Sequence, residues 1–254
     1  MNEIPACKID MNLSMKRFWI VLLCAAVGVT ALAGIGFNRW YAPALQAGEA
    51  DPTLMGSVQA VATLHRLYPI FTDPGEREGM TLRQRQAVET EFQQLLQQVP
   101  LDLLLPQMEK YSVAYASQVK AFDDPQGFVA RLSRVAMNGI ITPAVVEAPA
   151  HGSIRFRPAA THAGDVTSFA PTDKTIFAVF DSSAYRDTRV LVKWYHRDTG
   201  QIVLFRQFEI ADGDSNYIWI DNENGFGSGE YRVEIYRVNE ILALLSSGEY
   251  RVED

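Results

Sequence analysis

The segment from residue 212 to residue 223 has the spacing of a calcium-binding loop. Its oxygen-bearing side chains occupy the first, third, fifth and twelfth positions, as Asp212, Asp214, Asn216 and Glu223. Carboxylate and amide oxygens at these positions are the ligands that Ca²⁺ takes in such a loop. The sixth position, however, requires Gly for a sharp bend and is Tyr217 here. We therefore expect a polar turn between strands, with calcium binding as the alternative.

The other chemistry-bearing residues form no catalytic motif in the sequence. His65, His151, His162 and His196 are scattered, and no two have the spacing of zinc ligands on a helix. The chain contains neither the G-x-S-x-G elbow of serine hydrolases nor a G-x-x-x-x-G-K-S/T phosphate loop. The sequence therefore predicts no catalytic residue, no cofactor and no resident metal. We expect that the protein is not an enzyme.

Residues 18–37 form an apolar stretch of 20 residues without a charged side chain. As a helix this stretch would rise about 30 Å, which matches the hydrocarbon core of a membrane. Lys8, Lys16 and Arg17 precede it, and this excess of basic residues predicts that residues 1–17 are a cytoplasmic tail. We expect a single-pass protein of the inner (cytoplasmic) membrane, with the bulk of the chain in the periplasm.

A second interpretation treats the same stretch as a signal peptide. If translation begins at Met15, a short basic region and an apolar region precede a small-residue cleavage site near Ala33. The mature protein would then be secreted or periplasmic. Both cysteines, Cys7 and Cys24, precede residue 38, so the exported part would form no disulfide in either interpretation.

The composition argues against two broad classes of protein. The 254 residues are 48% hydrophobic, which is enough for a folded core and unlike a disordered chain. The formal net charge is -7. Because a broad basic surface is needed to neutralise phosphates, we expect no nucleic-acid partner.

Residues 51–140 have the periodicity of amphipathic helices, whose apolar stripes are expected to pack in a small bundle. Capping residues and prolines mark where these helices begin and end. A Thr at position 81 precedes the second helix, and an Asp at position 124 precedes the fourth. The four helices are predicted at residues 51–69, 81–99, 106–122 and 124–138.

Residues 141–152 contain two prolines and no helical period, which predicts a semi-rigid linker. Residues 153–254 then alternate between apolar and polar side chains, as the strands of a β-sandwich do. Strands are predicted at 153–157, 174–180, 189–196, 201–210, 216–221, 230–237 and 240–252. Two of them are apolar on both faces, so we expect the helical part or a partner to cover part of one sheet.

Two segments near the C-terminus carry a family resemblance. Residues 229–233 resemble the G-x-Y-x-C segment that begins strand F of immunoglobulin-like domains, with Tyr231 as the tyrosine and Val233 in place of the cysteine. Trp194 resembles the strand C tryptophan of the same domains. The resemblance covers only residues 153–254 and implies a bacterial extracytoplasmic Ig-like or fibronectin-like sandwich without a disulfide. It implies structural roles for these three residues and no activity.

The sequence SGEYRVE occurs twice, at residues 228–234 and 247–253. Two copies are too few for a solenoid. We expect two strands in similar environments, each with Tyr and Val on one face and Glu and Arg on the other. The alternative is that the C-terminal copy detaches and pairs with a neighbouring molecule.

The predicted fold class is α+β in separate modules. An N-terminal transmembrane helix (18–37) and a small α-helical bundle (51–140) are followed by a linker (141–152) and a C-terminal Ig-like antiparallel β-sandwich (153–254). No family is recognised for the helical part.

The leading functional hypothesis is a non-enzymatic, membrane-anchored envelope protein that mediates protein–protein assembly in secretion, adhesion or envelope maintenance. Its expected partners are envelope proteins. The alternative is an exported glycan- or peptide-binding module, in which Tyr195, Tyr217 and Trp219 form an aromatic interaction surface. Exposure of these rings on one face would favour the alternative, and their burial would argue against it. An enzyme would require convergent polar groups in a deep pocket between the two parts.

Overall fold

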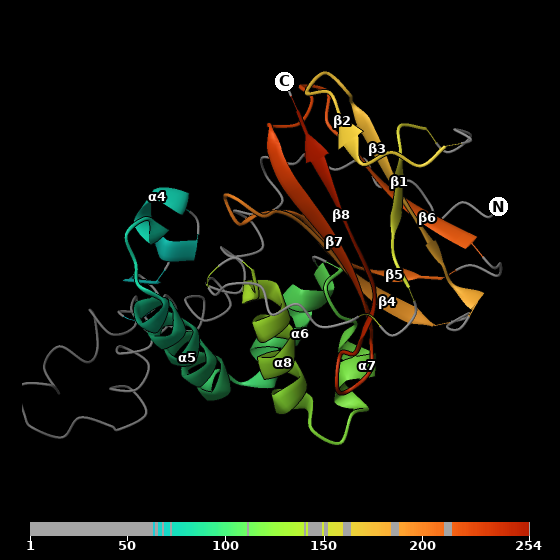
Figure 1. Cartoon of the computed structure of the whole chain (residues 1–254). Helices are drawn as coiled ribbons and strands as arrows, with labels where there is room; N and C mark the ends of the chain where they lie inside the picture. Colours follow the sequence, from blue (N-terminus) through green and yellow to red (C-terminus); the bar gives the residue numbers. More distant parts are fainter. Residues whose placement is uncertain are drawn as a thin grey trace, which may run out of the picture.

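The computed structural model describes residues 63, 66–67, 69–71, 73–110, 112–139, 141, 149, 152–159, 164–183, 188–210 and 215–253. The apolar segment 18–37, most of the first predicted helix and most of the linker lie outside these residues. Among the helices that are described, none is both long and apolar enough to cross a membrane. The described chain is a mixed α+β protein, with helices followed by a β-rich C-terminal region (Figure 1).

Two of the predicted helices are confirmed together with their caps. Helix α5 (Leu82–Gln98) begins at Thr81, which forms a reciprocal capping box with Gln84. Helix α8 (Pro125–Met137) begins at Asp124, whose Oδ1 accepts a hydrogen bond from the Gly127 amide at 2.8 Å. The short helix α4 (Pro74–Arg77) precedes α5.

The third helix, predicted at residues 106–122, is wrong in its bounds. The structure has helix α6 (Leu101–Lys110) and, separately, helix α7 (Ala116–Lys120). Helix α6 ends in a Schellman motif, in which the Val113 amide donates to the Met108 carbonyl and the Ser112 amide to the Glu109 carbonyl. Ser112 has φ 54°, the left-handed conformation that reverses the chain. A serine at that position is not a recognisable stop signal in the sequence.

The β-rich region contains two sheets. The three-stranded sheet has the order β1 (Arg155–Arg157), β3 (Thr175–Asp181), β6 (Ser215–Asp221). The five-stranded sheet has the order β2 (Ser168–Phe169), β8 (Leu244–Val252), β7 (Gly229–Arg237), β4 (Arg189–His196), β5 (Gln201–Glu209). All pairings are antiparallel except that of β2 with β8. The sandwich-like arrangement of sheets is thus confirmed, and β2 is a strand that the sequence did not predict.

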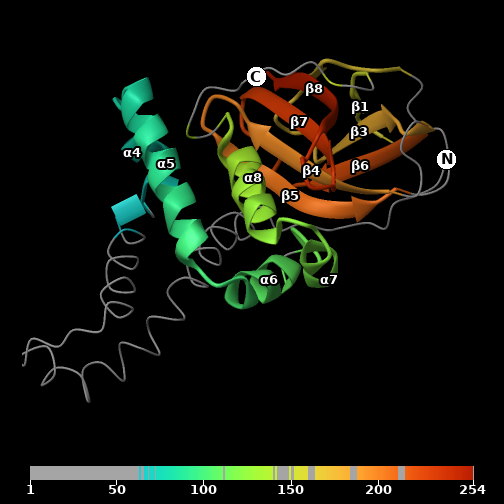
Figure 2. The same cartoon turned by 90° about the horizontal axis from the view of Figure 1, so that it is seen from below.

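Alternate residues of strand β4 enter two different cores. Val190, Val192 and Trp194 face the interior between the two sheets. Leu191 and Tyr195 face the opposite side, where they join a core built mainly from the helices. The helices therefore cover the outer face of the five-stranded sheet, and Figure 2 shows α8 lying against it.

Hydrogen bonds also join the helical layer, residues 66–141, to the sandwich. The Gln207 amide on β5 donates to the Ser112 carbonyl at 2.7 Å. Six residues further along the chain, the Gln118 side chain donates to the Val238 carbonyl at 3.3 Å. We call the contact region between the helical layer and the five-stranded sheet the junction.

Candidate functional site

The three residues with predicted structural roles gather in the sandwich. Trp194 is fully buried, and its indole N–H donates to the Tyr250 hydroxyl at 3.0 Å. Val233 lies directly opposite Trp194 on the neighbouring strand β7. The Tyr231 hydroxyl donates to the Gly227 carbonyl at 2.8 Å, four residues upstream, and burial raises the pKa of Tyr231 to about 12.

The two copies of the sequence repeat pair with each other on strands β7 and β8. Tyr231 lies opposite Tyr250, and their rings stack with centroids 5.1 Å apart and an interplanar angle of 5°. Because the strands run antiparallel, the first Glu of each copy lies opposite the Arg of the other, so Glu230 faces Arg251 and Glu249 faces Arg232. The repeat is thus a self-complementary pairing unit. The Tyr and Val of each copy share one face, as the sequence predicted, and that face lies inside the sandwich.

The charged residues of the repeat form a ladder of ion pairs across the outer face of the five-stranded sheet. Arg197 at the end of β4 joins the two copies, because its guanidinium lies 3.1 Å from the carboxylates of both Glu230 and Glu249. Exposed pairs of this kind contribute little stability individually, whereas buried ones are sensitive to the loss of a partner. In spatial order, the ladder consists of Glu253, Arg251, Glu230, Arg197, Glu249, Arg232 and Glu234.

The ladder ends at a buried ammonium group in the junction. Lys193 on β4 is fully buried, with its Nζ 3.9 Å from a Glu234 carboxylate oxygen. The same Nζ donates to the Val135 carbonyl at 2.8 Å and to the Asn138 carbonyl. These carbonyls lie at the C-terminal end of α8, where a cation is favoured by the helix dipole. Desolvation lowers the pKa of Lys193 to about 8.

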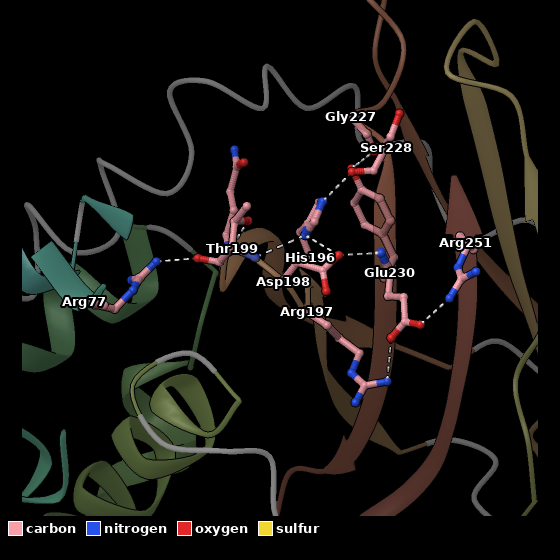
Figure 3. Close-up of polar contacts among 11 residues, drawn as sticks. Arg77, His196, Arg197, Asp198, Thr199, Gly227, Ser228, Glu230 and Arg251 are labelled. Atoms are coloured by element: carbon pink, nitrogen blue, oxygen red, sulfur yellow. Dashed lines mark hydrogen bonds and ion pairs between the residues drawn. The ribbon is translucent and has the colours of Figure 1, made fainter. Parts of the chain in front are cut away.

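A second polar cluster lies where the turn between β4 and β5 meets the start of β7 (Figure 3). The His196 ring is 7% exposed, with Nε2 3.1 Å from the Ser228 carbonyl and Nδ1 accepting from the Thr199 amide at 3.3 Å. Asp198 accepts a hydrogen bond from the Glu230 amide at 3.0 Å. The two hydrogen bonds of the ring define a neutral imidazole that carries its proton on Nε2.

The helical layer contacts this cluster through Arg77 of α4. Its guanidinium donates to the Thr199 carbonyl in the turn and to the Ile70 and Phe71 carbonyls in its own layer. Burial is the main cause of the lowered pKa of Arg77. A buried cation is thus held by backbone carbonyls of both layers.

The three residues of the predicted aromatic surface lie in two different regions of the structure. Tyr195 is fully buried in the junction, so its assignment to an interaction surface is corrected: the helical layer covers that face of β4. Tyr217 and Trp219 lie on β6, facing away from the sandwich interior. There they contact Phe177 of β3, whose ring stacks on Trp219 with centroids 5.8 Å apart. We call Phe177, Tyr217 and Trp219 the aromatic cluster.

Exposure differs within the aromatic cluster. Tyr217 is 3% exposed, whereas Phe177 and Trp219 are half-buried. Two arginines of β1 lie on the same face of the sheet, since Arg157 is opposite Phe177 and Arg155 is opposite Val179. Both arginines pair with Asp165, at 2.9 and 3.8 Å. The outer face of the three-stranded sheet thus combines aromatic rings with guanidinium groups.

The two described residues of the possible calcium loop, Asn216 and Glu223, do not lie together. Asp212 and Asp214 lie outside the described residues. Asn216 is buried in β6 and donates to the Ser182 hydroxyl at 2.6 Å, whereas Glu223 follows that strand and is exposed. An extended strand rises about 3.3 Å per residue, so the five steps from Asn216 to Asp221 at the end of β6 already span about 16 Å, and Glu223 follows in the next turn. They cannot bind the same ion.

No other metal site is found in the part of the chain that the structure describes, because it contains no group of three or more His, Cys, Asp or Glu side chains that could bind an ion.

Three residues of the sites described above were not predicted from the sequence: Lys193, Arg77 and Phe177. A lysine within the apolar run VLVKWYH was a signal for a buried charge, since such a residue requires a partner. Arg77 and Phe177 had no comparable signal.

Comparisons with known proteins give no family. No protein-family model matches the chain, and no curated protein matches it at a significant level. A crystal structure of the soluble domain of PmoD from Methylocystis sp. ATCC 49242 (Rockwell) aligns with 39% of this chain and 89% of that chain, at 10% identity and a TM-score of 0.30. A likeness at this level carries no argument about fold or function.

Proposed function

We propose that the protein is a non-enzymatic interaction module of the cell envelope, which is anchored by residues 18–37 and binds a partner protein. The observation that carries this proposal is the aromatic cluster on the outer face of the three-stranded sheet. The opposite side of the sandwich is already covered by the helical layer of the same chain. The outer face of the three-stranded sheet is not covered by that layer, and it presents the half-buried rings of Phe177 and Trp219 to a partner.

The residue types on this face favour a protein partner. Trp, Tyr and Arg are the side chains that most often dominate the binding energy of protein interfaces. Trp219 and Phe177 offer half-exposed ring surface, and Arg155 has 47% of its side chain exposed beside them. A glycan-binding platform uses aromatic rings as well. The burial of Tyr195 and Tyr217 argues against it, and we keep it as the second candidate only because Trp219 and Phe177 stack with an interplanar angle of 25°.

The strand order supports an immunoglobulin-like assignment of the sandwich. If β4, β5, β7 and β8 are strands C, C′, F and G, the five-stranded sheet has the order G, F, C, C′ that variable-type domains use. The hydrogen bond from the Tyr231 hydroxyl to the Gly227 carbonyl has the geometry of a tyrosine corner. Such domains commonly serve as binding modules, but the fold alone does not specify a partner.

Site-specific photo-crosslinking in intact cells tests the proposal. A photoreactive amino acid replaces Phe177 in the full-length chain, and the matched control carries it at Leu82, which is 51% exposed on α5. We expect discrete protein adducts from position 177 and none of the same size from position 82. Adducts with glycan alone would favour the second candidate. Equal labelling from both positions would contradict a specific aromatic interface.

Whether the apolar segment 18–37 is retained is tested on the same preparation. Mass spectrometry of the N-terminus distinguishes a retained apolar segment from a chain that begins just after Ala33. We expect retention, and a protein recovered only from the membrane fraction. A mature chain beginning at residue 34 would remove the anchor and leave an exported binding module.

A further inference from the structure

Both ring nitrogens of His196 are used in the structure, and they have opposite roles. Nε2 donates to the Ser228 carbonyl at 3.1 Å, and Nδ1 accepts from the Thr199 amide at 3.3 Å (Figure 3). A second proton can only go to Nδ1, which would then be a donor facing another donor. The Thr199 hydrogen bond therefore exists only while the imidazole is neutral.

The ring has little room to avoid this conflict. The Tyr231 ring packs edge-on against it, with centroids 4.6 Å apart. Gly229 also lies close to the ring: it has φ 138°, and a Cβ at that residue would lie 2.5 Å from His196 Cε1. A charged imidazole thus has to be accommodated by movement of the turn, residues 197–200.

The charged groups around the ring come from three elements. Asp198 of the turn is the nearest anion, with Oδ2 4.0 Å from Nδ1, and the same oxygen accepts the Glu230 amide. Arg197 in the turn is paired with Glu230 of β7. Arg77 of α4 donates to the Thr199 carbonyl, on the same turn. The titratable Tyr231 of β7 completes the surroundings and stays neutral.

We infer that His196 is an acid-sensitive joint between the sandwich and the helical layer. Protonation of Nδ1 breaks the bond to the Thr199 amide and draws Asp198 towards the ring to form an ion pair. This movement pulls on the turn, whose Thr199 carbonyl holds the Arg77 guanidinium. Acidification thereby loosens the contact of α4 with the sandwich. The inference does not depend on the aromatic cluster or on the proposed function.

Hydrogen exchange of the full-length chain in detergent micelles tests the joint at pH 7.5 and pH 5.0, with labelling times corrected for the intrinsic effect of pH. The loss of one neutral hydrogen bond is expected to raise the exchange rate of the segment by about threefold to tenfold. We therefore expect exchange that is faster by this factor at the acidic pH in peptides covering residues 197–201 and 73–78. Peptides from the sandwich interior, such as 231–236, should show no such change. A wild-type chain without the difference overturns the inference.

Two variants assign the effect to the imidazole. His196→Asn keeps an oxygen acceptor near the position of Nδ1 and gains no proton in this range, so its exchange should not respond to pH. Asp198→Asn removes the carboxylate that the charged ring draws towards it. Residues 197–201 should then still respond through the lost bond to the Thr199 amide, whereas the response of residues 73–78 should become smaller. A response that persists in His196→Asn, or a response of residues 73–78 that is unchanged in Asp198→Asn, contradicts the inference.

A spectroscopic measurement keeps the test independent of variant folding. In a chain labelled with ¹⁵N-histidine, the neutral form of His196 should show a protonated Nε2 and an unprotonated Nδ1. The resonances of His196 are identified as those that are missing in His196→Asn, or as those that a paramagnetic label attached in the turn, residues 197–200, broadens. A neutral ring protonated on Nδ1 would overturn the assignment of the hydrogen bonds.

Discussion

The interior of the sandwich and the junction under the helices lie on opposite faces of the same strands, and they differ in how they treat polar groups. In the interior, the Trp194 indole donates to the Tyr250 hydroxyl among closely packed apolar side chains. In the junction, Lys193 and Glu234 are buried charges. The Tyr195 hydroxyl has no hydrogen-bond partner among the described residues.

The difference indicates a division of roles. Burial of apolar surface stabilises the interior, whereas a buried ion pair costs desolvation energy that its attraction only partly offsets. The buried charge makes the orientation of the helices specific. The ammonium of Lys193 donates to two carbonyls at the C-terminal end of α8, and a helix in a shifted position would not place these carbonyls beside it. The sandwich is therefore expected to be the stable body, with the helical layer as the part fixed to it in one orientation.

The largest expected loss of stability comes from removing a large side chain from the sandwich interior. Trp194→Ala removes a fully buried ring and the partner of the Tyr250 hydroxyl, and it should lower the free energy of unfolding by about 3–5 kcal/mol. Tyr195→Phe, one residue away on the junction face, removes only a hydroxyl that lacks a partner and should change stability by less than about 1 kcal/mol. Urea unfolding followed by far-UV circular dichroism measures both. Equal losses would show that the two faces do not differ.

The pH dependence of stability tests the junction through Lys193. Its folded pKa of about 8 is lowered from 10.5, so between these values the unfolded chain binds more protons than the folded one. Stability therefore rises with pH in this window, by about 2 kcal/mol between pH 8 and pH 10. Above about pH 10 it should fall, because burial raises the pKa values of Tyr231, Tyr236 and Tyr250 and the unfolded chain loses those protons first.

Lys193→Met is the matched control for this prediction. Met has a similar length and no titratable group, so the rise between pH 8 and pH 10 should be absent while the fall above pH 10 remains. Denaturant midpoints of both proteins at several pH values give the comparison. A rise of the same size in Lys193→Met would show that another group is responsible.

A smaller loss is expected where the chain leaves α8. Gly139 has φ 75°, and a Cβ there would lie 2.7 Å from the Tyr195 hydroxyl oxygen. Gly139→Ala should therefore lower stability by about 1–2 kcal/mol through backbone strain and crowding. The double variant with Tyr195→Phe should recover part of this loss, because the crowding atom is gone. Thermal unfolding of the three variants separates strain from crowding, and no recovery would assign the whole effect to the backbone.

Local sequence signals predicted most elements of the fold because the relevant interactions are local. Strand β4 was predicted at residues 189–196, and α5 was found from its capping residue. The break between α6 and α7 depends on one serine in a left-handed conformation, and β2 is only two residues long, so neither has a sequence pattern.

The candidate site was less predictable because it depends on which layer covers each face. Alternation along β4 shows that Tyr195 points away from Trp194, but only the packing of the helices reveals that this side is buried. Likewise, Phe177 joins Tyr217 and Trp219 through the register of β3 with β6, which no spacing in the sequence specifies.

The smallest effect on stability is expected at the exposed end of the ion-pair ladder, the end farthest from the buried Lys193. Glu230 lies 2.7 Å from Arg251 on β8, in a solvent-exposed pair that salt screens. Glu230→Arg places like charges opposite each other and should lower the melting temperature slightly, more at low salt than at high salt. Arg251→Glu in the same chain restores an opposite-charge pair with reversed polarity, so the double variant should recover part of the loss. The recovery cannot be complete, because Arg197 also binds Glu230 and would then face an arginine. If the double variant were no more stable than the single one, the pair of residues 230 and 251 would contribute nothing measurable to the pairing of the repeat, which would then depend on the stacked tyrosines and on the more buried pair of Arg232 with Glu249.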